Sequence, residues 1–295
     1  MNNEQNNNFH QPVMVKEVIE NLITNKNGIY VDCTFGGGGH SKKILSNLDK
    51  NAKLIGFDQD EDVIKNAEMI DDSRFTFIKS NFKYICNFLD YLNIDYIDGV
   101  FADLGVSSYQ IDTPDRGFST RYNGILDMRM NKDNPKNAYD IINKYCEKDL
   151  IYIFENFGEL HNSKKIVQII CKNRHYKRIK TTDDLKELLL TNIKLPLNYR
   201  NRFLAQVFQA LRIEVNDELT NLEIFLNKIT SKLKENSRIA ILSYHSLEDR
   251  IVKNFAKNNN NLTPLFPKPL TPSNDEISSN SRSRSAKLRI YFLRK

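Results

Sequence analysis

The chain has 295 residues, of which 40% are hydrophobic, and its 17 Phe and 13 Tyr can form a sizeable core. A formal net charge of +6 permits an anionic partner such as nucleic acid without requiring one. No apolar run is long enough to cross a bilayer, and the polar, Asn-rich N-terminus resembles neither a signal peptide nor a transit peptide. We interpret residues 1–8 as a disordered tail.

Alternating strand and helix patterns fill the first third of the chain. After a helical pattern at 13–22, short apolar runs indicate strands at 28–32, 53–58, 74–82 and 96–105. Between them, helical spacing predicts helices at 40–48, 61–70 and 84–94. Such alternation is typical of an α/β fold, in which helices cover both faces of a parallel sheet.

A block of about 100 residues then shows helical spacing only. Its predicted helices lie at 136–145, 148–157, 161–173, 181–190 and 201–219. The strand-then-helix pattern returns at 237–250, and a last strand is predicted at 286–293, after a long loop rich in Asn, Pro and Ser at 258–285. We therefore expect a discontinuous α/β domain (9–112 and 217–295) with an all-helical domain inserted at 113–216.

The glycine-rich stretch "DCTFGGGGHS" follows the first predicted strand, where α/β folds bind ligands. It lacks the G-x-x-x-x-G-K-[ST] spacing of a phosphate-binding loop. It also lacks a dinucleotide fingerprint, because Gly36 and Gly38 are followed by Ser41 where the third glycine would stand. The remaining candidate is a nucleoside without pyrophosphate, and S-adenosylmethionine fits.

Asp58 ends the second predicted strand, about 20 residues beyond the loop, where an acid can accept hydrogen bonds from both ribose hydroxyls. An alternative is that Asp58 caps the helix that follows it, and the two roles are compatible.

Two more strand ends carry polar groups. Asp103 ends the fourth strand at the edge that faces a transferred methyl group, and Ser107 follows in "DLGVSSYQ". Either could accept a proton from a substrate, although Ser107 could also be an ordinary turn residue. His245 follows the fifth strand and could be a base or, more often at such a position, a structural group. His40 adjoins the glycine loop, which favours ligand contact.

Several motifs are similar to those of one known family, in the same order, from His10 to Arg294. They resemble the MraW (RsmH) family of bacterial 16S ribosomal RNA (cytosine-N4)-methyltransferases in "DCTFGGGGHS", "GFDQD", "ADLGVSSYQID", "LDMRM", "FQALRIEVNDEL", "SYHSLEDRIVK" and "RSAKLRIY". The chain departs from the family pattern in having Asn-Gly-Ile at 123–125, Asn131 and Tyr109.

The resemblance implies a Rossmann-like, S-adenosylmethionine-dependent methyltransferase sheet with an inserted all-helical domain. It implies methyl transfer to N4 of one cytidine in the decoding region of 16S rRNA, within the small ribosomal subunit. It also implies that the cofactor is contacted by Gly38, Gly39, His40, Asp58, Phe82, Asp103 and Gln110.

The inserted domain is expected to recognise RNA. The segment 171–180, "CKNRHYKRIK", combines basic and aromatic side chains suited to phosphate contacts and stacking, or it is a solvated helix end. Two alternatives to this function stay open: a methyltransferase with another substrate, and a non-catalytic ribosome-assembly factor. We expect no metal site, and the four scattered cysteines, without a C-x-x-C pair, indicate reduced thiols in the cytoplasm.

Overall fold

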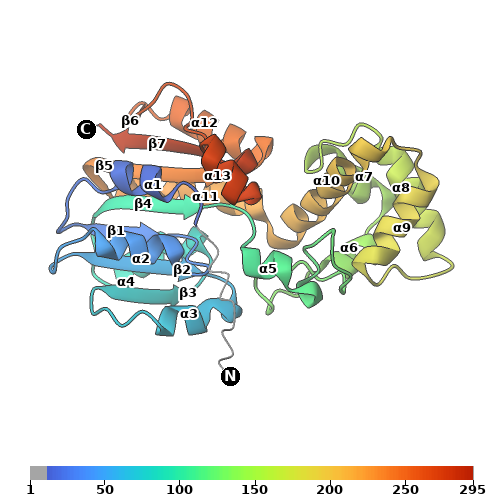
Figure 1. Cartoon of the computed structure of the whole chain (residues 1–295), viewed down its shortest axis with the longest axis horizontal. Helices are drawn as coiled ribbons and strands as arrows, with labels where there is room; N and C mark the ends of the chain where they lie inside the picture. Colours follow the sequence, from blue (N-terminus) through green and yellow to red (C-terminus); the bar gives the residue numbers. More distant parts are fainter. Residues whose placement is uncertain (1–11, 295) are drawn as a thin grey trace. The chain divides into compact units, whose positions relative to one another are not determined.

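A computed structural model describes residues 12–294 and divides into two compact units (Figure 1). Unit 1 combines the chain up to Gly105 with the chain from Asn221 onward, and unit 2 is Val106–Thr220. The predicted insertion at 113–216 falls inside unit 2. The predicted tail at 1–8 lies outside the described residues.

Unit 1 contains a sheet of seven strands in the order β3-β2-β1-β4-β5-β7-β6. Its strands are β1 (Ile29–Asp32), β2 (Lys53–Asp58), β3 (Phe75–Lys79), β4 (Ile97–Asp103), β5 (Leu233–Ser243), β6 (Leu262–Pro264) and β7 (Lys287–Leu293). The first five strands pair in parallel, whereas β7 runs antiparallel to β5 and β6 antiparallel to β7. The strand order reverses beside β1, as in a Rossmann-like sheet, and confirms the predicted fold class.

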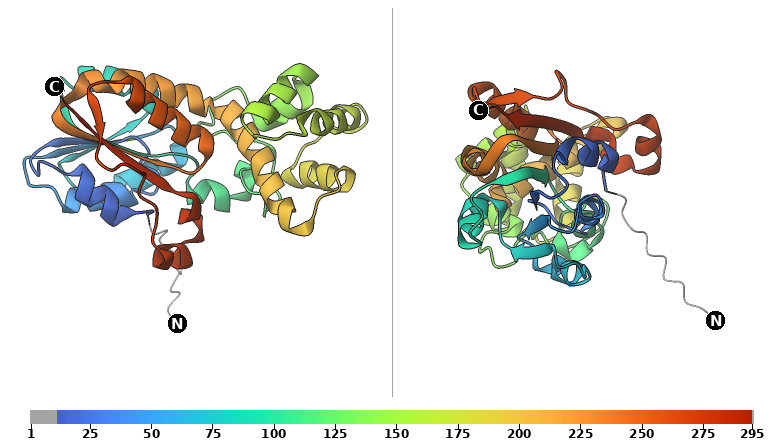
Figure 2. Two further views of the ribbon diagram at one scale, coloured as in Figure 1. Left: turned by 90° about the horizontal axis from the view of Figure 1, so that it is seen from above. Right: turned by 90° about the vertical axis from the view of Figure 1, so that its left-hand side faces the viewer.

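Helices cover both faces of this sheet (Figure 2). One face packs on α1 (Val15–Leu22) and α2 (Gly39–Ser46), and the other packs on α4 (Ile85–Tyr91), α11 (Glu218–Ile229) and α12 (Ser246–Asn258). The side chains of β4 show how the sequence produces this arrangement. Phe101 packs towards α1 and α2, while its neighbours Val100 and Ala102 pack towards the opposite face. Because both faces of such a strand are buried, its sequence is a continuous apolar run and does not alternate between apolar and polar residues.

The helix predicted at 61–70 is instead a 3-10 turn, η1 (Glu61–Val63), followed by the short α3 (Ile64–Glu68).

The prediction of a long loop at 258–285 is wrong where this segment forms regular elements. The segment contains β6, α13 (Asn274–Ser279) and a 3-10 turn, η5 (Ser281–Ser285). These elements are too short to show periodicity. The Ser and Asn residues that suggested a loop act as caps, because the Ser273 hydroxyl accepts the Glu276 N–H and the Asn280 side chain accepts the Arg282 N–H.

Unit 2 is helical, as predicted, and is organised around one long helix, α10 (Leu197–Asn216). The other helices are α5 (Ser108–Asp112), α6 (Ala138–Lys144), α7 (Glu147–Asn156), α8 (Ser163–Arg174) and α9 (Thr182–Asn192). The inward face of α10, including Phe203, Val207 and Leu211, packs in one core with α6 to α9. None of the helices in residues 12–294 is long and apolar enough to cross a membrane.

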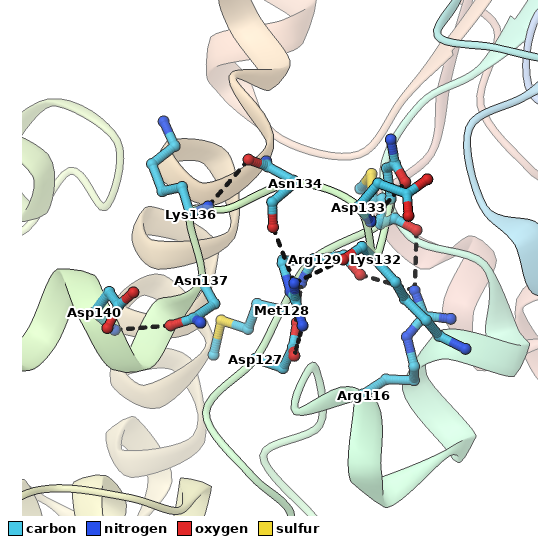
Figure 3. A network of polar contacts seen from close by, with 12 residues as sticks. Arg116, Asp127, Met128, Arg129, Lys132, Asp133, Asn134, Lys136, Asn137 and Asp140 are labelled. Carbon is cyan, nitrogen blue, oxygen red and sulfur yellow. Dashed lines mark hydrogen bonds and ion pairs between the residues drawn. The ribbon is translucent and has the colours of Figure 1, made fainter.

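The "LDMRM" motif of unit 2 lies in an irregular segment between η3 (Pro114–Arg116) and α6 that is held by its own arginines (Figure 3). Arg129 donates two hydrogen bonds to the carboxylate of Asp127, both of 2.8 Å, and its third nitrogen donates to the carbonyls of Lys132 and Asn134. The buried Arg116 donates to the carbonyls of Arg129 and Met130. These arginines stabilise a segment that has no regular secondary structure of its own.

Candidate active site

Three carboxylates stand at the carboxyl ends of neighbouring strands in unit 1. Asp32 ends β1, Asp58 ends β2 and Asp103 ends β4. In the parallel pairing, Asp32 lies opposite Gly56 of β2 and Phe101 of β4, so all three side chains reach the same edge of the sheet. This is the edge at which open α/β sheets bind ligands.

The glycine loop between β1 and α2 has two kinds of glycine. Gly38 has φ +74°, and an added Cβ would lie 2.7 Å from Phe35 Cζ. A Cβ on Gly39 would lie 2.4 Å from Pro12 Cγ. At the exposed Gly37, by contrast, no described atom would lie within 4 Å of an added Cβ. Gly38 and Gly39 are therefore required by the fold itself, while Gly37 leaves bare backbone open to a ligand.

Asp32 holds the glycine loop in place through two hydrogen bonds. The Ser41 hydroxyl donates to Asp32 Oδ2 at 2.7 Å, and the Thr34 N–H donates to Oδ1 at 3.1 Å. Burial raises the pKa of Asp32, although both hydrogen bonds act to lower it. Asp32 was not among the predicted site residues, although its position at the end of the first predicted strand was an available signal.

Asp58 holds the loop from the other side. Its Oδ2 accepts the Gly36 N–H at 2.8 Å and its Oδ1 accepts the Asp60 N–H at 2.9 Å. Burial raises the pKa of Asp58 to about 6, and those two hydrogen bonds limit the rise. The alternative that Asp58 caps the next helix is wrong, because Asp60 is the cap and accepts the Asp62 N–H.

Among the residues that the structure describes, Asp103 has one side-chain donor, the phenol of Tyr244, which donates to Oδ1 at 2.7 Å. Burial raises the pKa of Asp103 to about 7, the Tyr244 hydrogen bond lowers it, and the charge of Glu248 raises it further. The side chain is nevertheless 24% exposed, so an incoming molecule can reach it. Tyr244 was not among the predicted site residues, because its partner lies 141 residues earlier in the chain.

His40, on α2, is buried beside Asp103. Its Nε2 lies 2.9 Å from the Val13 carbonyl, which can only accept, so Nε2 carries a proton. Its Nδ1 lies 3.8 Å from Asp103 Oδ2. Burial lowers the pKa of His40, so the ring is neutral and presents an unprotonated Nδ1 towards the carboxylate. His40 therefore adds no positive charge that would offset the negative charge of the Asp103 carboxylate.

His245 has the structural role that the sequence analysis favoured. It is the N-cap of α12, forms a capping box with Glu248, and its Nε2 lies 3.1 Å from Glu248 Oε1. Glu248 also accepts the Tyr244 N–H at 2.9 Å, so this cap positions the phenol that donates to Asp103.

The remaining predicted contacts are distributed between the two units. Phe82 begins the turn η2 (Phe82–Tyr84) after β3 and packs edge-on against Phe225 with ring centroids 5.4 Å apart. Ser107 and Gln110 belong to unit 2 and form a capping box at the start of α5. The Ser107 hydroxyl accepts the Gln110 N–H at 3.2 Å, and Gln110 Oε1 accepts the Ser107 N–H at 3.0 Å. Ser107 therefore has a structural role as a helix cap, which is the alternative to a proton acceptor that the sequence left open.

The carboxylates at this edge raise one another's pKa. The charge of Asp32 raises the pKa of Asp58, and the charge of Asp103 raises that of Asp32. An edge with this charge repels a pyrophosphate and stabilises a cation. The geometry suits a positively charged ligand that lies on bare backbone at Gly37, which is the chemistry of a sulfonium with a nucleoside attached.

The basic segment at 171–180 in unit 2 is partly internal. Arg174 donates to the carbonyls of Ile142 and Tyr145, and Arg178 donates to that of Asn143, so both satisfy the C-terminal carbonyls of α6. Tyr176 stays 85% exposed. The role of this segment in RNA contact stays a prediction.

Comparisons with known proteins give consistent results. The family model described as the MraW methylase family matches residues 7–293. A Flavobacterium johnsoniae protein named ribosomal RNA small subunit methyltransferase H is 47% identical over 296 residues, covering 96% of this chain and 97% of its own. An Amoebophilus asiaticus protein of the same name is 46% identical over 303 residues, covering 98% of this chain and 97% of its own.

Proposed function

This chain belongs to the MraW methylase family, and on that premise we propose that it methylates N4 of one cytidine in the decoding region of 16S ribosomal RNA. It is an S-adenosylmethionine-dependent methyltransferase. The observation that carries the proposal is Asp103, a partly exposed carboxylate with a pKa of about 7 beside a glycine loop whose backbone is open at Gly37.

The residues at the sheet edge fit the cofactor. When bound, S-adenosylmethionine supplies an electrophilic methyl group on a positively charged sulfur. Asp32, Asp58 and Asp103 provide negative charge around that position. Each oxygen of Asp58 accepts one backbone N–H and retains a second lone pair, so the carboxylate can still accept two ribose hydroxyls. We propose that Gly38, Gly39, His40, Phe82 and Gln110 complete the binding site.

Asp103 is our candidate for the group that accepts the proton of the cytosine amine. That amine is a poor nucleophile because its lone pair is shared with the ring, so it needs positioning and a hydrogen-bond acceptor. An acceptor works best when its pKa lies near the working pH. The Ser107 hydroxyl is the second candidate, but it already accepts a hydrogen bond as a helix cap. Tyr244 orients Asp103 and keeps its pKa from rising further.

The substrate is proposed to be the small ribosomal subunit in the cytoplasm. The relatives' name, ribosomal RNA small subunit methyltransferase, supports this choice. We propose that unit 2 recognises the RNA, since a target base must be unstacked before it enters a catalytic pocket and a helical unit can hold the surrounding strand.

The test is incubation with labelled S-adenosylmethionine and small subunits that lack this methyl group, followed by digestion of the RNA to nucleosides. The proposal predicts label in N4-methylcytidine, and label that forms roughly 10²- to 10⁴-fold more slowly with the Asp103→Asn variant. Label in another nucleoside would overturn the substrate while keeping the cofactor. Cofactor binding without any transfer would favour the assembly-factor alternative.

A further inference from the structure

The turn between α9 and α10, together with the end of α9 and most of α10, forms a cationic region of sequence without an acidic residue. Residues 188–213 contain no Asp or Glu but include Lys194, Arg200, Arg202 and Arg212. Arg212 pairs with Glu218 at 2.8 Å. For the other three, no carboxylate lies within ion-pair distance anywhere in residues 12–294. Lys194, Arg200 and Arg202 therefore form a local excess of positive charge that no ion pair with another described residue compensates.

A shallow depression in the surface lies at this turn and is open to solvent. It is lined by Leu190, Thr191, Ile193, Lys194, Leu195, Pro196 and Arg200. Lys194 and Arg200 therefore place two cations beside short apolar side chains on an accessible surface, where an anionic group with an organic part can be bound.

Arg200 lines the depression and has one donor that the protein does not use. Its Nε is buried and has no hydrogen-bond partner among the described residues. Arg200 as a whole is only partly buried, so the guanidinium can meet an oxyanion at the surface even though its Nε is enclosed. The planar guanidinium can donate two parallel hydrogen bonds to a phosphate.

Exposed apolar side chains adjoin the cations. Leu197 is 77% exposed and Tyr199 is 38% exposed, and the guanidinium of Arg202 lies 5.9 Å from the Tyr199 ring centroid. An aromatic ring among cations is the pattern by which proteins bind unpaired nucleotides, through stacking and phosphate contacts together.

We propose that the α9–α10 turn binds an unpaired nucleotide of the RNA substrate. Lys194 and Arg200 hold its phosphate, and Tyr199 and Leu197 contact its base. The inference deepens the proposed function and rests on it, because it assumes an RNA substrate. It assigns a second RNA contact in unit 2, separate from the segment 171–180.

The experiment uses the full-length protein and a fragment of decoding-region RNA, with RNA affinity measured at several salt concentrations. Arg200→Ala and Tyr199→Leu should each weaken RNA binding roughly 10-fold, the range expected for one phosphate or stacking contact. Arg200→Ala should also reduce the salt dependence by about 0.7 in the slope of log affinity against log salt. S-adenosylmethionine affinity should not change.

Two further variants complete the design. Lys148→Glu is the matched control, because Lys148 is exposed in unit 2 but stands between Glu147 and Asp149, where an RNA phosphate would be repelled. Lys194→Glu alters an exposed position, so it decides the question if Arg200→Ala fails to fold.

The outcomes separate the two proposals. Unchanged RNA affinity in Lys194→Glu and Arg200→Ala, alongside normal methylation by the unaltered protein, would overturn the nucleotide site and leave the proposed function intact. An equal loss in Lys148→Glu would also overturn it, because it would reflect net charge alone. Failure of the unaltered protein to methylate or bind RNA would overturn the proposed function first.

Discussion

The two units use the same side-chain types in opposite ways, and the carboxylates Asp103 and Asp127 show the difference. In unit 2, Asp127 receives two hydrogen bonds from the guanidinium of Arg129, so its charge is neutralised. In unit 1, Asp103 receives one hydrogen bond from a neutral phenol and faces a neutral imidazole. No lysine or arginine in residues 12–294 pairs with it. A carboxylate neutralised by arginine supports structure, whereas one left with neutral donors is available for chemistry.

The largest expected effect tests that contrast directly. Asp103→Asn should lower kcat for methyl transfer by roughly 10²- to 10⁴-fold, the usual contribution of a positioned proton acceptor. Asp127→Asn should leave kcat of the folded protein within about 2-fold and reduce only its stability. Single-turnover transfer and urea unfolding of both variants provide the measurements. Equal losses of transfer in the two variants would end the distinction between the two carboxylates.

Stability against pH offers a second comparison, between Asp103 and Asp98 within unit 1. The folded-state pKa of Asp103 is raised to about 7, so its contribution to stability is present below pH about 4 and is lost as pH rises through about 7. Asp103→Asn should therefore gain stability relative to the unaltered protein between pH 4 and 7. The gain should be on the order of 2 kcal/mol after allowance for partial exposure.

Asp98 should behave in the opposite way. Burial acts to raise its pKa, but hydrogen bonds from the Ile29 N–H, Lys234 and Asn25 outweigh burial and lower it. Asp98→Asn should be less stable than the unaltered protein throughout pH 4 to 7, with the deficit shrinking only below about pH 4. Urea unfolding across this pH range tests both variants. If Asp103→Asn and Asp98→Asn both gained stability, or both lost it, the opposite pKa shifts of the two carboxylates would be contradicted.

Tyr244→Phe should sharpen the role of the phenol. Removing the donor that lowers the pKa of Asp103 should move the half-maximal pH of kcat upward by about one unit, with a roughly 10-fold loss at pH 6. Tyr145→Phe in unit 2, which removes a 3.0 Å hydrogen bond to Glu214, is the matched control and should leave the profile unchanged. An unshifted profile in Tyr244→Phe would exclude Asp103 as the titrating group.

The smallest expected effect concerns a cap in unit 2. Thr181 accepts the Asp184 N–H in a capping box at the start of α9. Thr181→Ala should reduce the free energy of unfolding by about 1 kcal/mol, and Thr181→Ser should restore most of it. Cofactor affinity, measured by calorimetry, should stay constant. A change in cofactor affinity would mean that the Thr181 cap in unit 2 affects ligand binding in unit 1.

The sequence predicted the alternation of strands and helices, the strand ends at Asp58 and Asp103 and the helical unit because each depends on local periodicity or position. It did not predict the Tyr244–Asp103 hydrogen bond, which exists because β4 and β5 pair in parallel with Asp103 opposite Leu242. Nor did it predict that Glu276, on α13, accepts the Met14 N–H at 2.7 Å. Contacts between residues far apart in the chain depend on register, which no short window contains.

The split of unit 1 into two chain segments has a consequence for biosynthesis. On the ribosome, β1 to β4 emerge first, and the edge of β4 stays without its neighbour until all of unit 2 has been made and β5 follows. Asp103 gains Tyr244 only at that late stage. Because the pairing is long-range and parallel, it is expected to be the slow step of folding and the one most exposed to aggregation. Nascent chains stalled within unit 2 should therefore present an open strand edge to chaperones, and no enzyme should be active before β5 and β7 have joined the sheet.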